Sequence, residues 1–365
     1  MAEMLQTIKG AWKAPELRKK ILFTVFILLI YRLGNAVPVP YVDVAALKEY
    51  FDTTLSNTVL GLYNAMSGSA FSRATVFALS INPYINSSII MQLLCIAIPA
   101  LERLQKDGGE EGRKKIASIT RYVTVGLALI MGFAYYSMLR NYGLLTQTGV
   151  LTGIVIVLTF TAGSAFIMWL GEQITEFGIG NGISIILFAS IISRIPSTVS
   201  SAITNIAGGA QSIGGVLVIL VLALALVIVI VFINDSERRI PIQYAKQMRG
   251  RKMYGGQSTF LPIKVNMSGV MPIIFAQSIA SLPATILAFN NPANDWKFTT
   301  VMRTITNTNG VLYAIVYFLL IIAFGYFYAA IQYNPIEIAN NLKKNGGYIP
   351  GFRPGRPTAE FIQKV

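Results

Sequence analysis

The chain has 365 residues and a formal net charge of +14, but only 13% of its residues are charged and 54% are apolar. Soluble domains usually contain about 25% charged residues, so this composition excludes a water-soluble globule and indicates a membrane protein. The chain has no histidine, which excludes histidine-based catalysis and histidine metal ligands. Its single cysteine, Cys95, excludes an internal disulfide and a cysteine-built metal site.

Apolar segments near the length that a helix needs to cross a bilayer, about 20 residues, recur along the whole chain. The fifth of these segments is the shortest and is flanked by glycines, whereas the sixth is apolar throughout. The sequence therefore predicts an all-α polytopic membrane protein with eight transmembrane helices. These segments lie at about 20–38, 75–100, 119–138, 150–171, 180–196, 213–233, 267–290 and 311–334.

Lysine and arginine are distributed unequally between the two sides of the predicted membrane. When the N-terminus is placed in the cytosol, 23 of the 30 basic residues fall on cytosolic segments and 7 fall elsewhere. Cytosolic loops characteristically carry such an excess. The sequence thus predicts that both termini lie inside and that the net charge belongs to one face.

Two cytosolic segments, 234–265 and 335–365, are longer than a turn between helices requires. Each mixes basic residues with Tyr, Phe and Pro. This composition favours docking onto an acidic or polyanionic partner, either RNA phosphate or an acidic protein surface, over a passive linker.

The second span carries a polar stripe with Pro83 near its start. The stripe contains Asn82, Asn86, Ser87, Ser88 and Gln92. Polar side chains that face lipid are costly, so the stripe should face a protein interface or a wet cavity. Two interpretations remain: hydrogen bonds within a static bundle, or the wall of a cavity.

The seventh span resembles the second, since Asn266, Ser268 and Gln277 are polar and Pro272 interrupts its first half. Corresponding interrupted helices five spans apart indicate two pseudo-symmetric halves around a functional path. We assign them to residues 1–196 and 197–365. Two halves of five spans would make ten, so this chain is expected to stop two spans short.

Residues 58–74 precede the second span and are too short to cross the bilayer. They predict either a half-helix that re-enters from outside or a helix lying on the membrane surface. Their apolar and small residues are Leu60, Gly61, Leu62, Tyr63, Met66, Gly68 and Phe71.

Acidic residues and lysine are absent from the middle of every predicted span. Charge-coupled transporters and voltage sensors usually need such a residue, and intramembrane aspartic proteases need two carboxylates. The chain also lacks a P-loop, so a partner would have to supply energy. We therefore expect neither an enzyme nor a cofactor site.

Five strings identify the chain as similar to SecY, the central subunit of the bacterial protein-translocation channel. The match covers nearly the whole chain, and the family has ten spans around a central pore. The strings are SGSAFSRATVFALSINPYI, GEQITEFGIGNGISII, RRIPIQYAKQMRGR, QSTFLPIKVNMSGVMPIIFA and NPIEIANNLKKNGGYIPGFRPGRPTAEFI.

The resemblance implies roles for residues at matching positions. The segment at about 58–74 would be the plug, a short re-entrant helix that closes the resting pore. The polar residues of spans two and seven, Asn82, Asn86, Gln92, Asn266, Ser268 and Gln277, would line the lateral gate. A narrow ring of aliphatic side chains, which disfavours water and ions by dewetting, would consist of Ile81, Ile85, Leu187, Ile191 and Ile274.

The resemblance also implies partners. The two long segments would dock the SecA motor ATPase and the ribosome through Arg238, Arg239, Arg249, Arg251, Lys252, Arg353 and Arg356. The other expected partners are the SecE and SecG subunits, signal peptides, unfolded preproteins and membrane lipid, in the bacterial plasma membrane. From the residues alone, a secondary transporter of small solutes and a scaffold or insertase without a pore remain alternatives.

Overall fold

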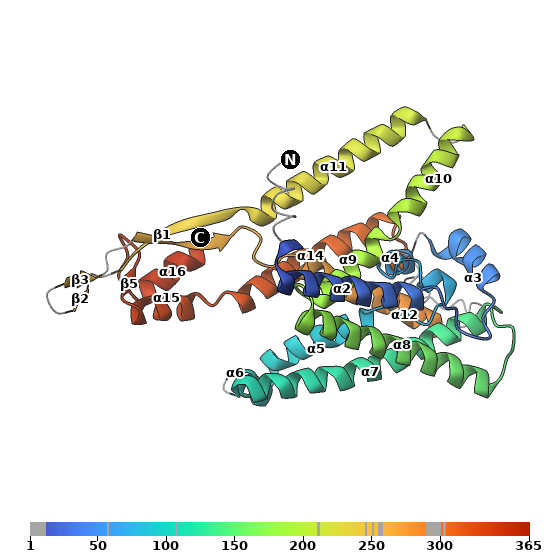
Figure 1. The fold of residues 1–365 in the computed structure, drawn as a ribbon, viewed down its shortest axis with the longest axis horizontal. Coiled ribbons are helices and arrows are strands. Elements are labelled where there is room, and N and C mark those ends of the chain that lie inside the picture. The colour runs from blue at the N-terminus through green and yellow to red at the C-terminus, as the bar shows by residue number, and fades with distance from the viewer. Residues whose placement is uncertain are drawn as a thin grey trace. The chain divides into compact units, whose positions relative to one another are not determined.

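The computed structural model describes residues 12–56, 58–106, 108–209, 212–244, 247–249, 252–254, 258–289, 301 and 304–365. These residues are mostly helical (Figure 1). They divide into two compact units, which are described separately. Unit 1 is Met1–Ser201 with Gln277–Val316, and unit 2 is Ala202–Ala276 with Tyr317–Val365.

Helices occupy all eight predicted spans. Five of the described helices are long and apolar enough to cross a membrane, or six if the bent pair α5 and α6 forms one span. The helices are α2 (Pro15–Gly34), α3 (Val44–Tyr50), the π-helix η1 (Phe51–Leu55), α4 (Val59–Met66), the 3-10 helix η2 (Phe71–Arg73), α5 (Asn82–Ala97), α6 (Pro99–Lys106), α7 (Gly109–Asn141), α8 (Val150–Phe177), α9 (Gly182–Ile192), α10 (Ile195–Ala207), α11 (Ile213–Asp235), α12 (Met271–Phe289), α14 (Val311–Gln332), α15 (Pro335–Lys344) and α16 (Arg356–Lys364).

The second span differs from the prediction at both ends. Residues 75–81 are not α-helical, and Ser80 adopts a left-handed backbone with a φ of 52°. Helix α5 begins at Asn82 because Pro83 fits the first turn of a helix, where its missing N–H is not needed. At the other end Pro99 disfavours helical backbone at Ile98, and α6 turns away from α5 by 106°.

The core of unit 1 is formed by side chains from three parts of the chain, namely the segment before α5, helix α7 and helix α8. Buried side chains of α3, η1 and η2 pack with Tyr135, Leu139 and Phe160. Rings dominate the contact: Phe71 lies parallel to Tyr135 with centroids 4.4 Å apart, and Tyr135 lies 4.9 Å from Phe160. The helices before α5 are therefore held on the ends of the long spans rather than left as free loops.

Unit 2 contains a small sheet built from both long segments, 234–265 and 335–365. Its strands are β1 (Glu237–Tyr244), β4 (Ser258–Lys264) and β5 (Gly347–Tyr348), in the order β4-β1-β5, and β2 (Gln247–Arg249) pairs with β3 (Lys252–Tyr254). Strand β1 alternates, with Ile240 and Ile242 buried and their neighbours exposed. Helices α15 and α16 lie beside the sheet (Figure 1) and share its core, to which Leu342 and Ile362 contribute.

We call the residues 237–264 and 335–365 together the two-loop domain. The sequence predicted two separate docking segments, and the structure shows that they form one hydrophobic core. The two segments are also tied by the Tyr348 hydroxyl, which donates to Gln243 Oε1 over 2.9 Å.

Candidate functional site

Helix α4 and the turn after it form the segment assigned to the plug. Val59 and Tyr63 are buried, whereas Leu62 is exposed. The turn approaches α9 closely: Gly68 has a φ of +66°, and a Cβ added there would lie 3.0 Å from the Ser190 carbonyl oxygen. Glycine is therefore required at this position both for its backbone and for the space it leaves.

The second part of the same segment is fixed by hydrogen bonds and by burial. The Asn64 side-chain oxygen accepts from the Ser72 N–H over 3.0 Å, and Ser67 Oγ accepts from the Phe71 N–H over 3.2 Å. The Phe71 ring is buried against Tyr135. The predicted plug therefore consists of a short helix, α4, and a buried anchor, Phe71.

A buried polar contact lies between α4 and the start of α5. Desolvation raises the pKa of the Tyr63 hydroxyl, and the Asn82 side chain opposes that shift. Neither the Tyr63 Oη nor the Asn82 Nδ2 atom has a hydrogen-bond partner of normal geometry among the described residues. Buried polar groups without a partner are costly, so this contact is a weak point in the packing of α4.

The four ring residues of unit 1 lie on α9 and at the start of α5. Ile81 and Ile85 are buried, Leu187 is half-buried, and Ile191 is 53% exposed. On α9 the buried face is formed instead by Gly182, Ile186 and Ser190, and Ser190 Oγ is hydrogen-bonded to the Tyr31 hydroxyl over 2.7 Å. Leu187 and Ile191 follow those positions by one residue and so lie on the adjacent face.

The polar stripe of the second span divides into two parts. Ser87 is fully buried and bonds to α7, to the Thr120 carbonyl over 2.8 Å and to Thr124 Oγ1 over 2.7 Å. It therefore belongs to static helix packing, the simpler of the two interpretations. Asn86 and Gln92 are only half-buried, as is Gln277 on α12.

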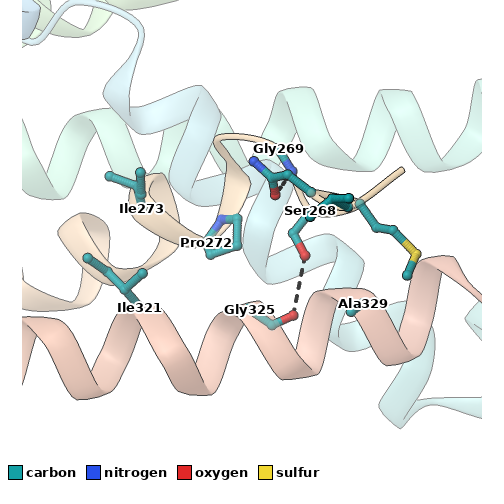
Figure 2. A pocket seen from close by; sticks show the side chains of 10 residues that line it. Ser268, Gly269, Pro272, Ile273, Ile321, Gly325 and Ala329 are labelled. Atoms are coloured by element: carbon teal, nitrogen blue, oxygen red, sulfur yellow. Dashed lines mark hydrogen bonds between the residues drawn. The ribbon is translucent and has the colours of Figure 1, made fainter. Parts of the chain in front are cut away.

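The polar residues before α12 are engaged within unit 2. Ser268 Oγ donates to the Gly325 carbonyl of α14 over 3.3 Å (Figure 2). Asn266 donates to Asn234 Oδ1 over 2.7 Å and accepts from the Gly269 N–H over 3.1 Å. Asn266, Ser268, Gly269 and Gly325 are among the residues that line a cavity of about 300 Å³. The hydrogen-bonding groups of Asn266 and Ser268 thus position the start of α12. Ile274 is half-buried three residues into that helix.

The docking residues that the structure describes are carried by the two-loop domain. Arg238, Arg239, Arg353 and Arg356 are all exposed. Two of them have acidic neighbours: Arg239 bonds to Glu237 over 2.7 Å and Arg356 to Glu360 over 3.3 Å. Arg249 and Lys252 are backbone pairing partners in the β2–β3 pair, and Arg251 lies outside the described residues.

The comparisons with known proteins decide the family. The SecY family profile matches residues 75–365. The protein translocase subunit SecY of Streptomyces scabiei is 44% identical over 99% of this chain and 85% of its own length. The chain belongs to the SecY family. The subunit SecY of Escherichia coli K12 is 41% identical over 99% of this chain and 81% of its own length.

Solved channel structures share the fold. A protein-conducting channel matches with a TM-score of 0.59 and 17% identity, covering 95% of this chain and 81% of its own. Canine Sec61 in a ribosome-channel complex matches with a TM-score of 0.57 and 16% identity, covering 95% of this chain and 81% of its own. Yeast Ssh1, in a complex bound to the 80S ribosome, matches with a TM-score of 0.61 and 17% identity, covering 95% of this chain and 80% of its own.

These matches confirm the predicted family and fold class, and they identify a membrane-embedded channel subunit rather than an enzyme. They do not support the secondary-transporter alternative. Among the described residues no cluster of His, Cys, Asp and Glu is suited to a metal ion. Sequence reasoning missed the joint core of the two-loop domain, although the alternation of Ile240 and Ile242 with exposed residues is a strand signal.

Proposed function

We propose that this SecY-family subunit translocates unfolded secretory polypeptides across the bacterial plasma membrane and releases transmembrane segments sideways into lipid. The N-terminus would lie in the cytosol, which the unequal distribution of basic residues supports. The halves 1–196 and 197–365 would flank the path. The observation that carries the proposal is the helix α4, which is too short to cross the membrane and packs against α9.

Helix α4 acts as the movable part of the plug, and Phe71 acts as its fixed end. The burial of Phe71 and the hydrogen bonds from Ser72 and Phe71 support this division. The imperfect Tyr63–Asn82 contact makes α4 the easier part to displace. The aliphatic ring would comprise the predicted residues Ile81, Ile85, Leu187, Ile191 and Ile274.

The half-buried Asn86, Gln92 and Gln277 are proposed as the polar lining of the lateral gate. They would hydrate the seam of the closed gate or form hydrogen bonds across it. A sufficiently apolar translocating segment would leave this seam for lipid, because each CH₂ group buried there stabilises it by about 0.8 kcal/mol. Asn82 belongs with the plug contact. Asn266 and Ser268 contribute by positioning the start of α12, as their bonds to Asn234 and Gly325 support.

The plug role predicts a specific leak. Deletion of residues 59–66, with Phe71 retained, is expected to raise the resting ion conductance of the complete channel at least about tenfold while export continues, because the dewetted ring alone seals less well. Conductance is measured in planar bilayers and export in vesicles. The variant Tyr63→Phe, which keeps α4, serves as the control. A deletion variant that conducts no better than this control would refute the plug role.

The exposed arginines of the two-loop domain are proposed to dock the SecA motor and the ribosome, and SecE and SecG are proposed as further subunits. The matched canine and yeast channels are in ribosome complexes. Guanidinium groups suit rRNA phosphate and carboxylates, because arginine donates two parallel hydrogen bonds to such groups. Arg353 is assigned chiefly to the motor, and the 249–252 cluster is assigned to both partners.

Charge reversal tests this docking. Arg353→Glu in the complete translocase is expected to weaken SecA binding about tenfold, or about 1.4 kcal/mol. Arg249→Glu should weaken both SecA and ribosome binding, and the ribosome affinity of the unmodified protein should fall steeply with salt. Binding is measured by cosedimentation with vesicles. Lys48→Glu, at an exposed position of α3, makes the same charge change and should have no effect. Equal affinities in all variants would show that these arginines do not dock the partners.

A further inference from the structure

A crevice that the plug, the gate and the docking surface do not use lies between α7 and α8. It has a volume of about 400 Å³ and is formed by the last turns of α7 and the first turns of α8. The crevice lies entirely in unit 1. Its lining includes Phe133, Tyr136, Arg140, Gly153, Val157 and Leu158.

The floor of the crevice follows from a close approach of the two helices. A Cβ added at Gly153 would lie 2.9 Å from the Tyr136 ring, so only glycine lets that ring pack on α8. Tyr136 is 9% exposed, whereas Phe133 and Leu158 on the rim are more than half exposed. The depression is thus rigid at its base and apolar on its walls.

The position of the crevice along the spans suggests what surrounds it. Both α7 and α8 are long and apolar enough to cross the membrane, so the exposed Phe133 and Leu158 face hydrocarbon. Arg140 lies one residue before α7 ends at Asn141, which places its charge at the level of the lipid headgroups. Among the described residues no carboxylate pairs with Arg140.

We propose that this crevice binds a membrane phospholipid, with one acyl chain along Phe133, Val157 and Leu158 and the phosphate on the Arg140 guanidinium. Favourable interaction with the negative C-terminal end of α7 explains a basic residue there, but not an apolar crevice beside it. A guanidinium matches a phosphate through two parallel hydrogen bonds. The combination of a cation at headgroup level and an apolar crevice below it matches the two parts of a phospholipid.

The test uses a phosphatidylglycerol probe with a photoreactive group in one acyl chain, in vesicles that hold the complete translocase. We expect labelling of Phe133, Ile154 or Leu158, mapped by peptide mass spectrometry. Unlabelled phosphatidylglycerol should compete with the probe, and diacylglycerol, which lacks the phosphate, should not. This arm needs no variant, so it does not depend on the folding of an altered chain.

Variants then separate the two parts of the site. Arg140→Gln is expected to lower labelling about tenfold, and Arg140→Lys should retain most of it. Val157→Phe fills the half-buried base of the crevice and should abolish labelling there. Val155→Phe makes the same change at a residue of α8 outside the crevice lining and should leave labelling unchanged. Thermal stability of each purified variant confirms folding.

Four outcomes would overturn the proposal. Equal competition by diacylglycerol, or labelling that survives Arg140→Gln, would show that no phosphate is bound. Equal loss of labelling in Val157→Phe and Val155→Phe would show unspecific contact with bulk lipid. A photoreactive residue at Leu158 that captures a protein subunit instead of lipid would show that a partner helix covers the crevice.

Discussion

Replacement of Phe71 with alanine is expected to lower the free energy of unfolding by about 3–5 kcal/mol. The side chain is only 4% exposed, and its ring lies parallel to Tyr135 at 4.4 Å and edge-on to Phe51 and Tyr63 at 6.1 and 5.8 Å. Alanine would leave a cavity among these three rings, which the aromatic core cannot readily close.

The same substitution should also open the resting channel. If Phe71 anchors the plug, its loss frees α4 along with the turn that contacts α9, and resting conductance should rise. Chemical denaturation of the purified complex and planar-bilayer recordings measure the two effects. Leu62→Ala, which shortens an exposed side chain of the same segment, is the control and should change stability by no more than about 0.5 kcal/mol. Equal stability of the two variants would show that Phe71 is not an anchor.

Replacement of Ile240 with aspartate is expected to remove SecA and ribosome binding together. Ile240 is 4% exposed in the core shared by the sheet and helices α15 and α16. An uncompensated charge in such a core costs about 3–5 kcal/mol, which a domain of this size cannot absorb. Both long segments should then lose their structure, although only one of them is altered.

The control for this prediction is Phe260→Asp. Phe260 lies on the neighbouring strand β4 but is 59% exposed, so the new carboxylate stays in water. Limited proteolysis should cut both 237–264 and 335–365 in Ile240→Asp and neither in Phe260→Asp. Cleavage of 237–264 alone, with Arg353-dependent SecA binding intact, would show that the segments fold and act separately.

Local signals in the sequence located much of the fold. Apolar runs near the length of a membrane-spanning helix placed the helices, and Asn181, whose side chain accepts from the Ser184 N–H, marks the start of α9. The predicted helix at 75–100 was wrong at its ends, since apolar composition does not distinguish a buried turn from a helix. Pro83 and Pro99 carried the missing information, because proline favours the first turn of a helix and disfavours helical backbone before it.

The candidate site was predicted as residue types but not as contacts. The composition of 58–74 indicated a short helix that does not cross the membrane, yet only the packing of Phe71 on Tyr135 supports the proposed division into a movable part and an anchor. In the same way, the basic composition of the two long segments indicated docking. The pairing of Gln243 with Tyr348 joins residues far apart in the chain, and no local pattern predicts such a pairing.

The low charge was sufficient, by itself, to indicate a membrane protein, and the unequal distribution of lysine and arginine predicted a basic face. The family-specific strings determined the channel fold. Only the tertiary structure decided which polar side chains are engaged: Ser87 bonds to Thr124, and Ser268 bonds to Gly325, whereas Asn86 stays half-exposed. The physical reason is that the partners of Ser87 and Ser268 lie on other helices, and the sequence around one polar residue does not specify which helix packs against it.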